Sequence, residues 1–343
     1  MPRHKKKKGI EGKKRGSISQ EKDKIFLHAV VHDEEKFNYG KFLTIDLKKG
    51  QVSECPYALL AEQGLNSMVS IGSVIYVVGG IKPDGMKCNK RPPNSSSGNK
   101  KGIYHKGMSF LDLNSDSNPG WVEAPYFHDT PDCSPSVLAF AGKIYVFVNG
   151  DSQAGIFDPT SNSWETLLPP PDHSIFDIIC TRSAVPDPVN NRILLDFGRM
   201  GCYYAYYPDE RRWEKVVEFI PFFPKHVFAD GVFYVYNPKM PDIVEAYDVS
   251  SKQWLNIEFT SEVHYRVWRY EFDDMFYLGN GLICLAGYSP NYDLPGTRTN
   301  LFIAKIRFHR STARPTHLVA TPFPLEIYTL DPPYSAIQSF LPI

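Results

Sequence analysis

A unit of four short strands recurs along this chain and restricts its possible folds more than any other feature. It is clearest between Ser136 and Leu168, where two apolar runs, 137–140 and 144–148, flank an Ala-Gly-Lys turn. Two further strands, 156–159 and 164–167, surround a Thr-Ser-Asn turn. One such sheet cannot bury both of its faces, so the sequence predicts that copies of it pack on either side.

Aromatic residues repeat with this unit. Four tryptophans lie 43, 49 and 41 residues apart: Trp121, Trp164, Trp213 and Trp254. Asp158 precedes Trp164 by six residues, and Asp248 precedes Trp254 by six. Four strands in about forty residues predict a β-propeller, a ring of four-stranded blades. We expect the tryptophans to pack between blades and the two aspartates to accept hydrogen bonds from backbone amides in the turns that follow them.

The unit resembles the kelch repeat. In that family a double glycine ends the second strand, a Tyr-Asp pair lies in the third, and a Trp opens the fourth. Gly79-Gly80 closes the stretch from Ser70, and Tyr247-Asp248 precedes Trp254 at the expected distance. The resemblance extends from residue 25 to about residue 310, and it implies a kelch-type β-propeller.

We count six units in the chain, which predicts an all-β, six-bladed propeller. The first unit lacks an innermost strand before Ile25, so we expect a strand from the C-terminal part of the chain, His317–Thr321, to complete it. Such pairing joins the two chain ends and removes open sheet edges. Glu326–Leu330 is either a further outer strand or a packed tail. The predicted organisation is a disordered basic tail at 1–24, the propeller at 25–330 and a C-terminal tail at 331–343.

Charge is unevenly distributed although the formal net charge is zero. Residues 1–24 contain ten Lys or Arg and three Asp or Glu, a net charge of +7, so the remainder carries −7. Two basic clusters, Lys5–Lys8 and Lys13–Arg15, suit a nuclear import signal or an arm that attracts nucleic acid; a solubilising tail is the alternative. We expect a nuclear or cytoplasmic protein.

Several classes of protein are disfavoured by the sequence. No apolar run reaches the length of a membrane span, and no apolar stretch directly follows the basic start as in a secretory signal. The six cysteines contain no CxxC pair, which favours reduced thiols. The motifs of common hydrolases, zinc proteases and nucleotide-binding proteins are missing. His28 and His32 lie four residues apart on a predicted strand, too far to share one metal ion.

The connections between units are the best candidates for a binding surface. Strands alternate in direction, so second-to-third connections and unit-to-unit connections emerge on the same face. A basic insertion at 81–106 and a second at 287–300 extend this face. Aromatic and basic residues gather in the unit-to-unit connections, where such types often dominate interface energy. The predicted partner-binding residues are His173, Lys225, His226, Tyr265, Arg266, Trp268 and Arg269.

We therefore expect a non-enzymatic module that presents one loop face to a protein partner, as a monomer without cofactor, metal or membrane contact. The chain resembles plant kelch proteins, many of which carry an F-box and select substrates for ubiquitination. Here the basic tail of only 24 residues is expected to leave no room for an F-box before the first strand. Two alternatives stay open. One is a kelch-type enzyme with a metal in the central funnel or a modified Tyr–Cys pair; Cys202 precedes Tyr203. The other is a nucleic-acid-associated nuclear protein.

Overall fold

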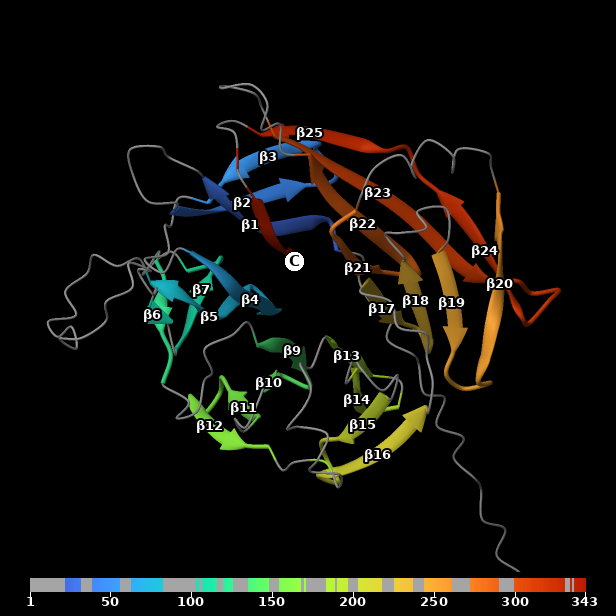
Figure 1. The fold of residues 1–343 in the computed structure, drawn as a ribbon, viewed down its shortest axis with the longest axis horizontal. Coiled ribbons are helices and arrows are strands. Elements are labelled where there is room, and N and C mark those ends of the chain that lie inside the picture. The colour runs from blue at the N-terminus through green and yellow to red at the C-terminus, as the bar shows by residue number, and fades with distance from the viewer. Residues whose placement is uncertain are drawn as a thin grey trace, which may run out of the picture.

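The fold is built from β-strands throughout the part of the chain that the computed structural model describes. The described residues are 22–31, 39–55, 63–82, 103–104, 107–115, 120–125, 135–147, 154–167, 170, 183–188, 190–196, 203–217, 225–236, 244–260, 272–289, 299–330, 334 and 336–343. They form sheets of mainly antiparallel strands arranged around a central axis, an all-β architecture consistent with a propeller (Figure 1). This described part contains no helix of the length and apolar character that a membrane crossing needs.

The first sheet contains strands from both ends of the chain. Its order is β26-β1-β2-β3, comprising β26 (Ala336–Pro342), β1 (Lys24–Val31), β2 (Tyr39–Asp46) and β3 (Gln51–Glu54). β26 runs antiparallel to β1, from the pair Ile25 and Pro342 to the pair Val30 and Ala336. The expectation that 331–343 forms a tail is therefore wrong, because most of this segment is a strand beside β1.

The next three sheets follow the chain from the innermost strand outward. The second sheet contains β4 (Gln63–Ile71), β5 (Val74–Lys82), β7 (Met108–Asp112) and β8 (Val122–Glu123), with β6 (Ile103–Tyr104) beside β5. The third sheet contains β9 (Ser136–Phe140), β10 (Lys143–Phe147), β11 (Gly155–Asp158) and β12 (Ser163–Thr166). The fourth sheet contains β13 (Ser183–Asp187), β14 (Arg192–Asp196), β15 (Tyr203–Tyr207) and β16 (Arg212–Val217).

The last sheet has nine strands and folds into two parts. One part contains β17 (Lys225–Ala229), β18 (Val232–Tyr236), β19 (Val244–Asp248) and β20 (Gln253–Phe259); the other contains β21 (Asp274–Gly279), β22 (Leu282–Ser289), β23 (Thr299–Arg310), β24 (His317–Pro322) and β25 (Glu326–Leu330). β24 joins the parts, because it pairs in parallel with β20 and antiparallel with β23. β25 pairs with the first half of β23, so of the two alternatives left open for 326–330, the further outer strand is the one that forms.

The position of β24 corrects the expectation that His317–Thr321 completes the first sheet. A short turn from Ser311 to Thr316 returns the chain beside β23, so the nearest free strand edge is that of β23 itself. Leu318 and Ala320 then point into the cluster between the two parts of the nine-stranded sheet. The strand from the C-terminal part of the chain that pairs with β1 is therefore β26.

Apolar side chains of the described residues gather in six clusters, each between two sheets or sheet parts that follow one another. One cluster joins Phe42 of the first sheet to Ile75 of the second, and another joins Leu278 of β21 back to Ile25 of β1. The innermost strands contact one another in the order β26, β4, β9, β13, β17 and β21, and β21 contacts β26. The core therefore lies between sheets, with each sheet covered on both faces.

The turn before each outer strand is built in the same way in four places. A residue with positive φ directly precedes the outer strand; these residues are Gly50, Asn162, Arg211 and Lys252. Asp158 accepts a hydrogen bond of 2.9 Å from the backbone N–H of Thr160, and Asp248 accepts one of 2.8 Å from that of Ser250. The expected role of these two aspartates is confirmed, since each satisfies turn amides next to its strand.

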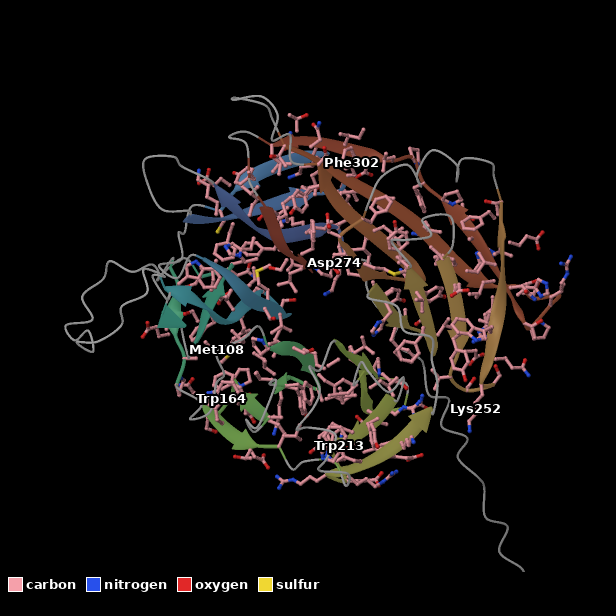
Figure 2. All side chains as sticks on the ribbon, in the orientation of Figure 1. Met108, Trp164, Trp213, Lys252, Asp274 and Phe302 are labelled. Carbon is pink, nitrogen blue, oxygen red and sulfur yellow. The ribbon has the colours of Figure 1, made fainter. Side chains whose placement is uncertain are left out.

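The repeat tryptophans do not all have the same environment. The ring centroid of Trp121 lies 5.0 Å from that of Phe42 in the preceding sheet. The indole N–H of Trp164 donates a hydrogen bond of 2.7 Å to the Pro125 carbonyl. Trp213 joins the cluster between the third and fourth sheets; Figure 2 labels it and Trp164. Trp254 is 41% exposed, so the expectation that it lies buried between sheets is wrong. Its ring contacts Tyr247 but lies outside the apolar cluster that Tyr247 joins.

Candidate partner-binding face

The two ends of the sheets differ in the kind of connection they carry. Tight turns join first to second strands, as at Gly72-Ser73 and Ala141-Gly142, and join third to fourth strands at the same end. We call this the turn end. Antiparallel pairing places the second-to-third connections and the sheet-to-sheet connections at the opposite end, which we call the loop end.

Five of the seven predicted partner-binding residues lie outside the described residues: His173, Tyr265, Arg266, Trp268 and Arg269. The other two, Lys225 and His226, were expected in a loop but are the first two residues of strand β17. They therefore lie at the loop end, on the innermost strand of their sheet. The His226 ring is partly buried, with its centroid 5.9 Å from that of Phe233, so it packs within the sheet.

The residues on either side of 261–271 are firmly held at the loop end. On the outer side, Thr260 donates its backbone N–H to the carbonyl of Ala320 at 3.0 Å. On the inner side, Phe272 is 1% exposed and its ring lies 5.9 Å from that of Tyr236. The next amide, that of Asp273, donates to the Ala286 carbonyl at 2.7 Å. One anchor follows an outer strand and the other precedes an innermost strand.

The basic insertion at 81–106 also begins from ordered structure. Ile81 pairs with Tyr104 and Lys82 with Ile103, so β5 and β6 form a two-stranded extension at the loop end. Gly79 precedes this extension with a φ of 77°, a left-handed conformation that glycine adopts without strain. Its N–H donates to the Gly107 carbonyl at 3.0 Å. The left-handed backbone conformation thus explains why the first residue of the Gly79-Gly80 pair is a glycine.

Several described carboxylates are held within the turns of their own sheets. The described residues contain no group of three or more His, Cys, Asp or Glu side chains that could hold a metal ion. The backbone N–H of Thr160 lowers the pKa of Asp158, and turn amides act in the same way on Asp46 and Asp112. These carboxylates are hydrogen-bonded within their own turns. Cys202, the cysteine beside Tyr203, lies outside the described residues.

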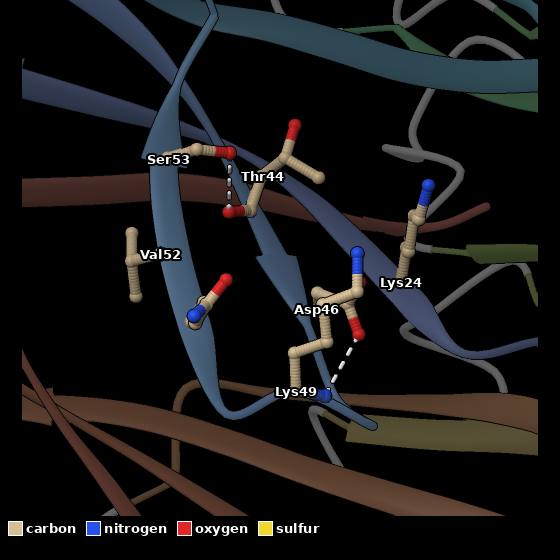
Figure 3. Close-up of a pocket in the computed structure, with 7 residues that line it drawn as sticks. Lys24, Thr44, Asp46, Lys49, Val52 and Ser53 are labelled. Atoms are coloured by element: carbon tan, nitrogen blue, oxygen red, sulfur yellow. Dashed lines mark hydrogen bonds and ion pairs between the residues drawn. The ribbon is translucent and has the colours of Figure 1, made fainter.

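A polar recess at the turn end of the first sheet was not foreseen from the sequence. It has a volume of about 360 Å³, and Figure 3 shows its lining residues: Lys24, Thr44, Asp46, Lys49, Gln51, Val52 and Ser53. Lys24 and Lys49 are far apart in the chain, and antiparallel pairing of β1 with β2 places Lys24 opposite Asp46. The only sequence feature that points to this recess is the frequency of lysine on both sides of one predicted hairpin.

Comparison with known proteins gives a limited relationship. No protein-family model matches the chain. A stretch of 111 residues, 31% of the chain, is 32% identical to a putative F-box/kelch-repeat protein of Arabidopsis thaliana. The chain spans about a quarter (24%) of the length of that relative. This partial similarity and the all-β architecture of several sheets agree with the resemblance to kelch repeats.

Proposed function

We propose that this chain is a six-bladed, kelch-type propeller, closed by pairing of β26 with β1, that acts as a protein-interaction module. The observation that carries the proposal is the pair of anchors at Thr260 and Phe272. They hold both ends of a connection containing Tyr265, Arg266, Trp268 and Arg269 at the loop end. Arginine and aromatic side chains combine large contact area with directed hydrogen bonds, which suits a protein interface.

The partner chemistry follows from the charges of that connection. Arg266 and Arg269 offer paired donors, and arginine forms bidentate hydrogen bonds with carboxylates. An acidic segment of a partner protein is the natural complement. Within this proposal the chain is a non-enzymatic binding module, and a role as a substrate adaptor is its most specific form. The similarity to a protein named for its kelch repeats supports the interaction role.

A pull-down followed by affinity measurements tests the proposal. A partner is first identified with the full chain, and its binding is then measured for the double variant Arg266→Ala with Arg269→Ala. We expect partner binding to fall while the melting temperature stays the same. A matched control, Lys252→Ala with Arg314→Ala, removes the same charge from turn-end connections and should bind normally. A partner that binds the loop variant undiminished would place the interface elsewhere.

A further inference from the structure

The hairpin of β23 and β24 projects outward from the ring at the turn end. In Figure 1 its tip is the red turn that extends beyond β20. Hydrogen bonds close this turn: the Ser311 amide donates to the His317 carbonyl at 3.0 Å, and the His317 amide donates to the Arg314 carbonyl at 2.9 Å. Residues 312–316 are exposed. The tip is therefore an ordered segment that another protein can reach.

Three hydroxyl groups lie in this turn, and two of them take part in its structure. The Ser311 hydroxyl accepts a hydrogen bond of 3.2 Å from the Arg314 amide, and the Thr316 hydroxyl lies 3.2 Å from the Nδ1 atom of His317. Among the described residues, none forms a hydrogen bond with the hydroxyl of Thr312. Thr312 is thus the hydroxyl of the turn that can react without first losing a partner.

Two arginines flank Thr312 at equal distances in the chain. Arg310 precedes it by two residues and Arg314 follows it by two. The Arg310 guanidinium donates to a carboxylate oxygen of Asp248 at 2.6 Å, and a guanidinium nitrogen of Arg314 lies 3.6 Å from a carboxylate oxygen of Glu258. Asp248 ends β19 and Glu258 lies on β20. Both arginines therefore connect the hairpin to the other part of the nine-stranded sheet.

We propose that Thr312 is a phosphorylation site for a protein kinase that recognises arginine beside its target hydroxyl, and that the phosphate weakens the link between β23 and β19. In the reaction the Oγ1 atom of Thr312 bonds to the γ-phosphorus of ATP. The bond from that phosphorus to its bridging oxygen breaks, ADP leaves, and the hydroxyl proton passes to the kinase.

The phosphate acts on the fold through the flanking arginines. A phosphothreonine has a charge of about −1.5 to −2 and three acceptor oxygens, so it competes with Asp248 and Glu258 for Arg310 and Arg314. The Asp248 carboxylate is buried, and the loss of its guanidinium partner destabilises the fold. The exposed Glu258 loses little. Because the hairpin tip is at the turn end, the modification leaves the proposed protein interface at the loop end accessible.

A kinase assay on the full chain tests the site, with magnesium ATP and a protein kinase that selects arginine near its target. Ser17 and Ser19 also follow basic residues, so every chain carries Ser17→Ala and Ser19→Ala. Mass spectrometry should locate phosphate on Thr312. The variant Thr312→Val should lose this phosphate, and the matched control Thr316→Val should keep it. An unmodified Thr312, or phosphate on Ser311 or Thr316 in its place, would overturn the proposal.

The role of the arginines is tested by the rate of the same reaction. Arg314→Gln should lower the rate of phosphate transfer to Thr312 about tenfold, since one hydrogen bond between charged groups is lost. The control Lys252→Gln removes a charge from a neighbouring turn and should leave the rate unchanged. Equal rates for Arg314→Gln and the control would contradict recognition through arginine. Equal melting temperatures show that both variants are folded.

Thermal unfolding tests the effect of the phosphate on the fold. The chain phosphorylated on Thr312 should melt about 2–4 °C below the same chain without phosphate. In Asp248→Asn the carboxylate that would lose its partner is absent, so phosphorylation should lower the melting temperature by less than about half as much. An unchanged melting temperature on phosphorylation, or an equal fall in Asp248→Asn, would refute the weakened link between β23 and β19.

Discussion

The guanidinium of Arg310 donates to a carboxylate oxygen of Asp248 at 2.6 Å and joins the end of β23 to the end of β19. The Asp248 side chain is 5% exposed and also accepts hydrogen bonds from the hydroxyl and amide of Ser250. Burial by itself would raise the pKa of Asp248, but its donors outweigh burial and lower the pKa to about 2. A repeat residue that caps its own turn thus also links the two parts of the nine-stranded sheet.

This linkage predicts a dependence of stability on pH. The pKa of Asp248 is lower in the folded protein than the ordinary value of 3.8. Folding is therefore favoured when the group is ionised, and its contribution is complete above about pH 4 and lost as the pH falls towards 2. Asp248→Asn should lower the free energy of unfolding at neutral pH by about 1–3 kcal/mol. It should also flatten the acid branch of stability, measured by urea unfolding at several pH values.

The control for this prediction is Arg314→Ala. A guanidinium nitrogen of Arg314 lies 3.6 Å from a carboxylate oxygen of Glu258, and both side chains are more than half exposed. Exposed pairs contribute little, so this change should cost less than about 1 kcal/mol. Equal losses for Asp248→Asn and Arg314→Ala would show that the Asp248 pair has no special weight.

Removal of β26 should destabilise the whole molecule. Deleting residues 334–343 exposes one edge of β1 and removes Ile337, Phe340 and Leu341 from the clusters on either side of the first sheet. An unpaired strand edge promotes association between chains. We expect a lower melting temperature and aggregation in size-exclusion chromatography. A truncated chain as soluble and heat-resistant as the full chain would contradict closure by β26.

Two glycines with similar backbone conformations should respond differently to alanine. Gly281 has a φ of 70°, and a Cβ there would lie 2.2 Å from the carbonyl oxygen of Phe308. Gly142 has a φ of 76°, but nothing lies within 4 Å of its Cβ position. Gly142→Ala should cost about 1–2 kcal/mol through backbone strain alone. Gly281→Ala should cost more in urea unfolding, because the close contact is added to the same strain; equal costs would refute this.

Trp164 and Trp254 provide a similar comparison between repeat positions. Trp164 packs against the second sheet and its indole N–H is hydrogen-bonded, so Trp164→Ala should cost about 3 kcal/mol. Trp254 is exposed, and Trp254→Ala should cost less than about 1 kcal/mol. Thermal unfolding of both variants checks the order. A larger loss for Trp254 would mean that its exposed surface is covered in solution.

The N-terminal segment is predicted to direct nuclear accumulation. Its two basic clusters, Lys5–Lys8 and Lys13–Arg15, suit recognition by an acidic import receptor. Replacing both clusters by alanine in a tagged full chain should shift the protein towards the cytoplasm in fluorescence imaging, without changing its melting temperature. An unchanged distribution would reject the import role.

Local sequence determined the repeating part of this protein. The sequence predicts Asp158 and Asp248 as turn residues because their hydrogen bonds reach amides only two residues away. The alternation of strand and turn could be predicted for the same reason, since glycine, asparagine and apolar runs act on the backbone next to them. The direction of the strands followed, and with it the division into a turn end and a loop end.

Tertiary structure decided which distant segments meet. His317–Pro322 and Ala336–Pro342 are both short strands rich in apolar residues, and nothing in either one specifies its neighbour. The short turn after Arg310 places β24 beside β23, and β26 pairs with β1. Which strand edge each segment pairs with depends on how the chain connects to it and on which apolar cluster its side chains can join. The exposure of Trp254 and the meeting of Lys24 and Lys49 in one recess are likewise properties of the folded chain. The pairing of distant strands and the exposure of a side chain depend on which surfaces remain uncovered after every sheet has packed. A local sequence pattern contains no information about those surfaces.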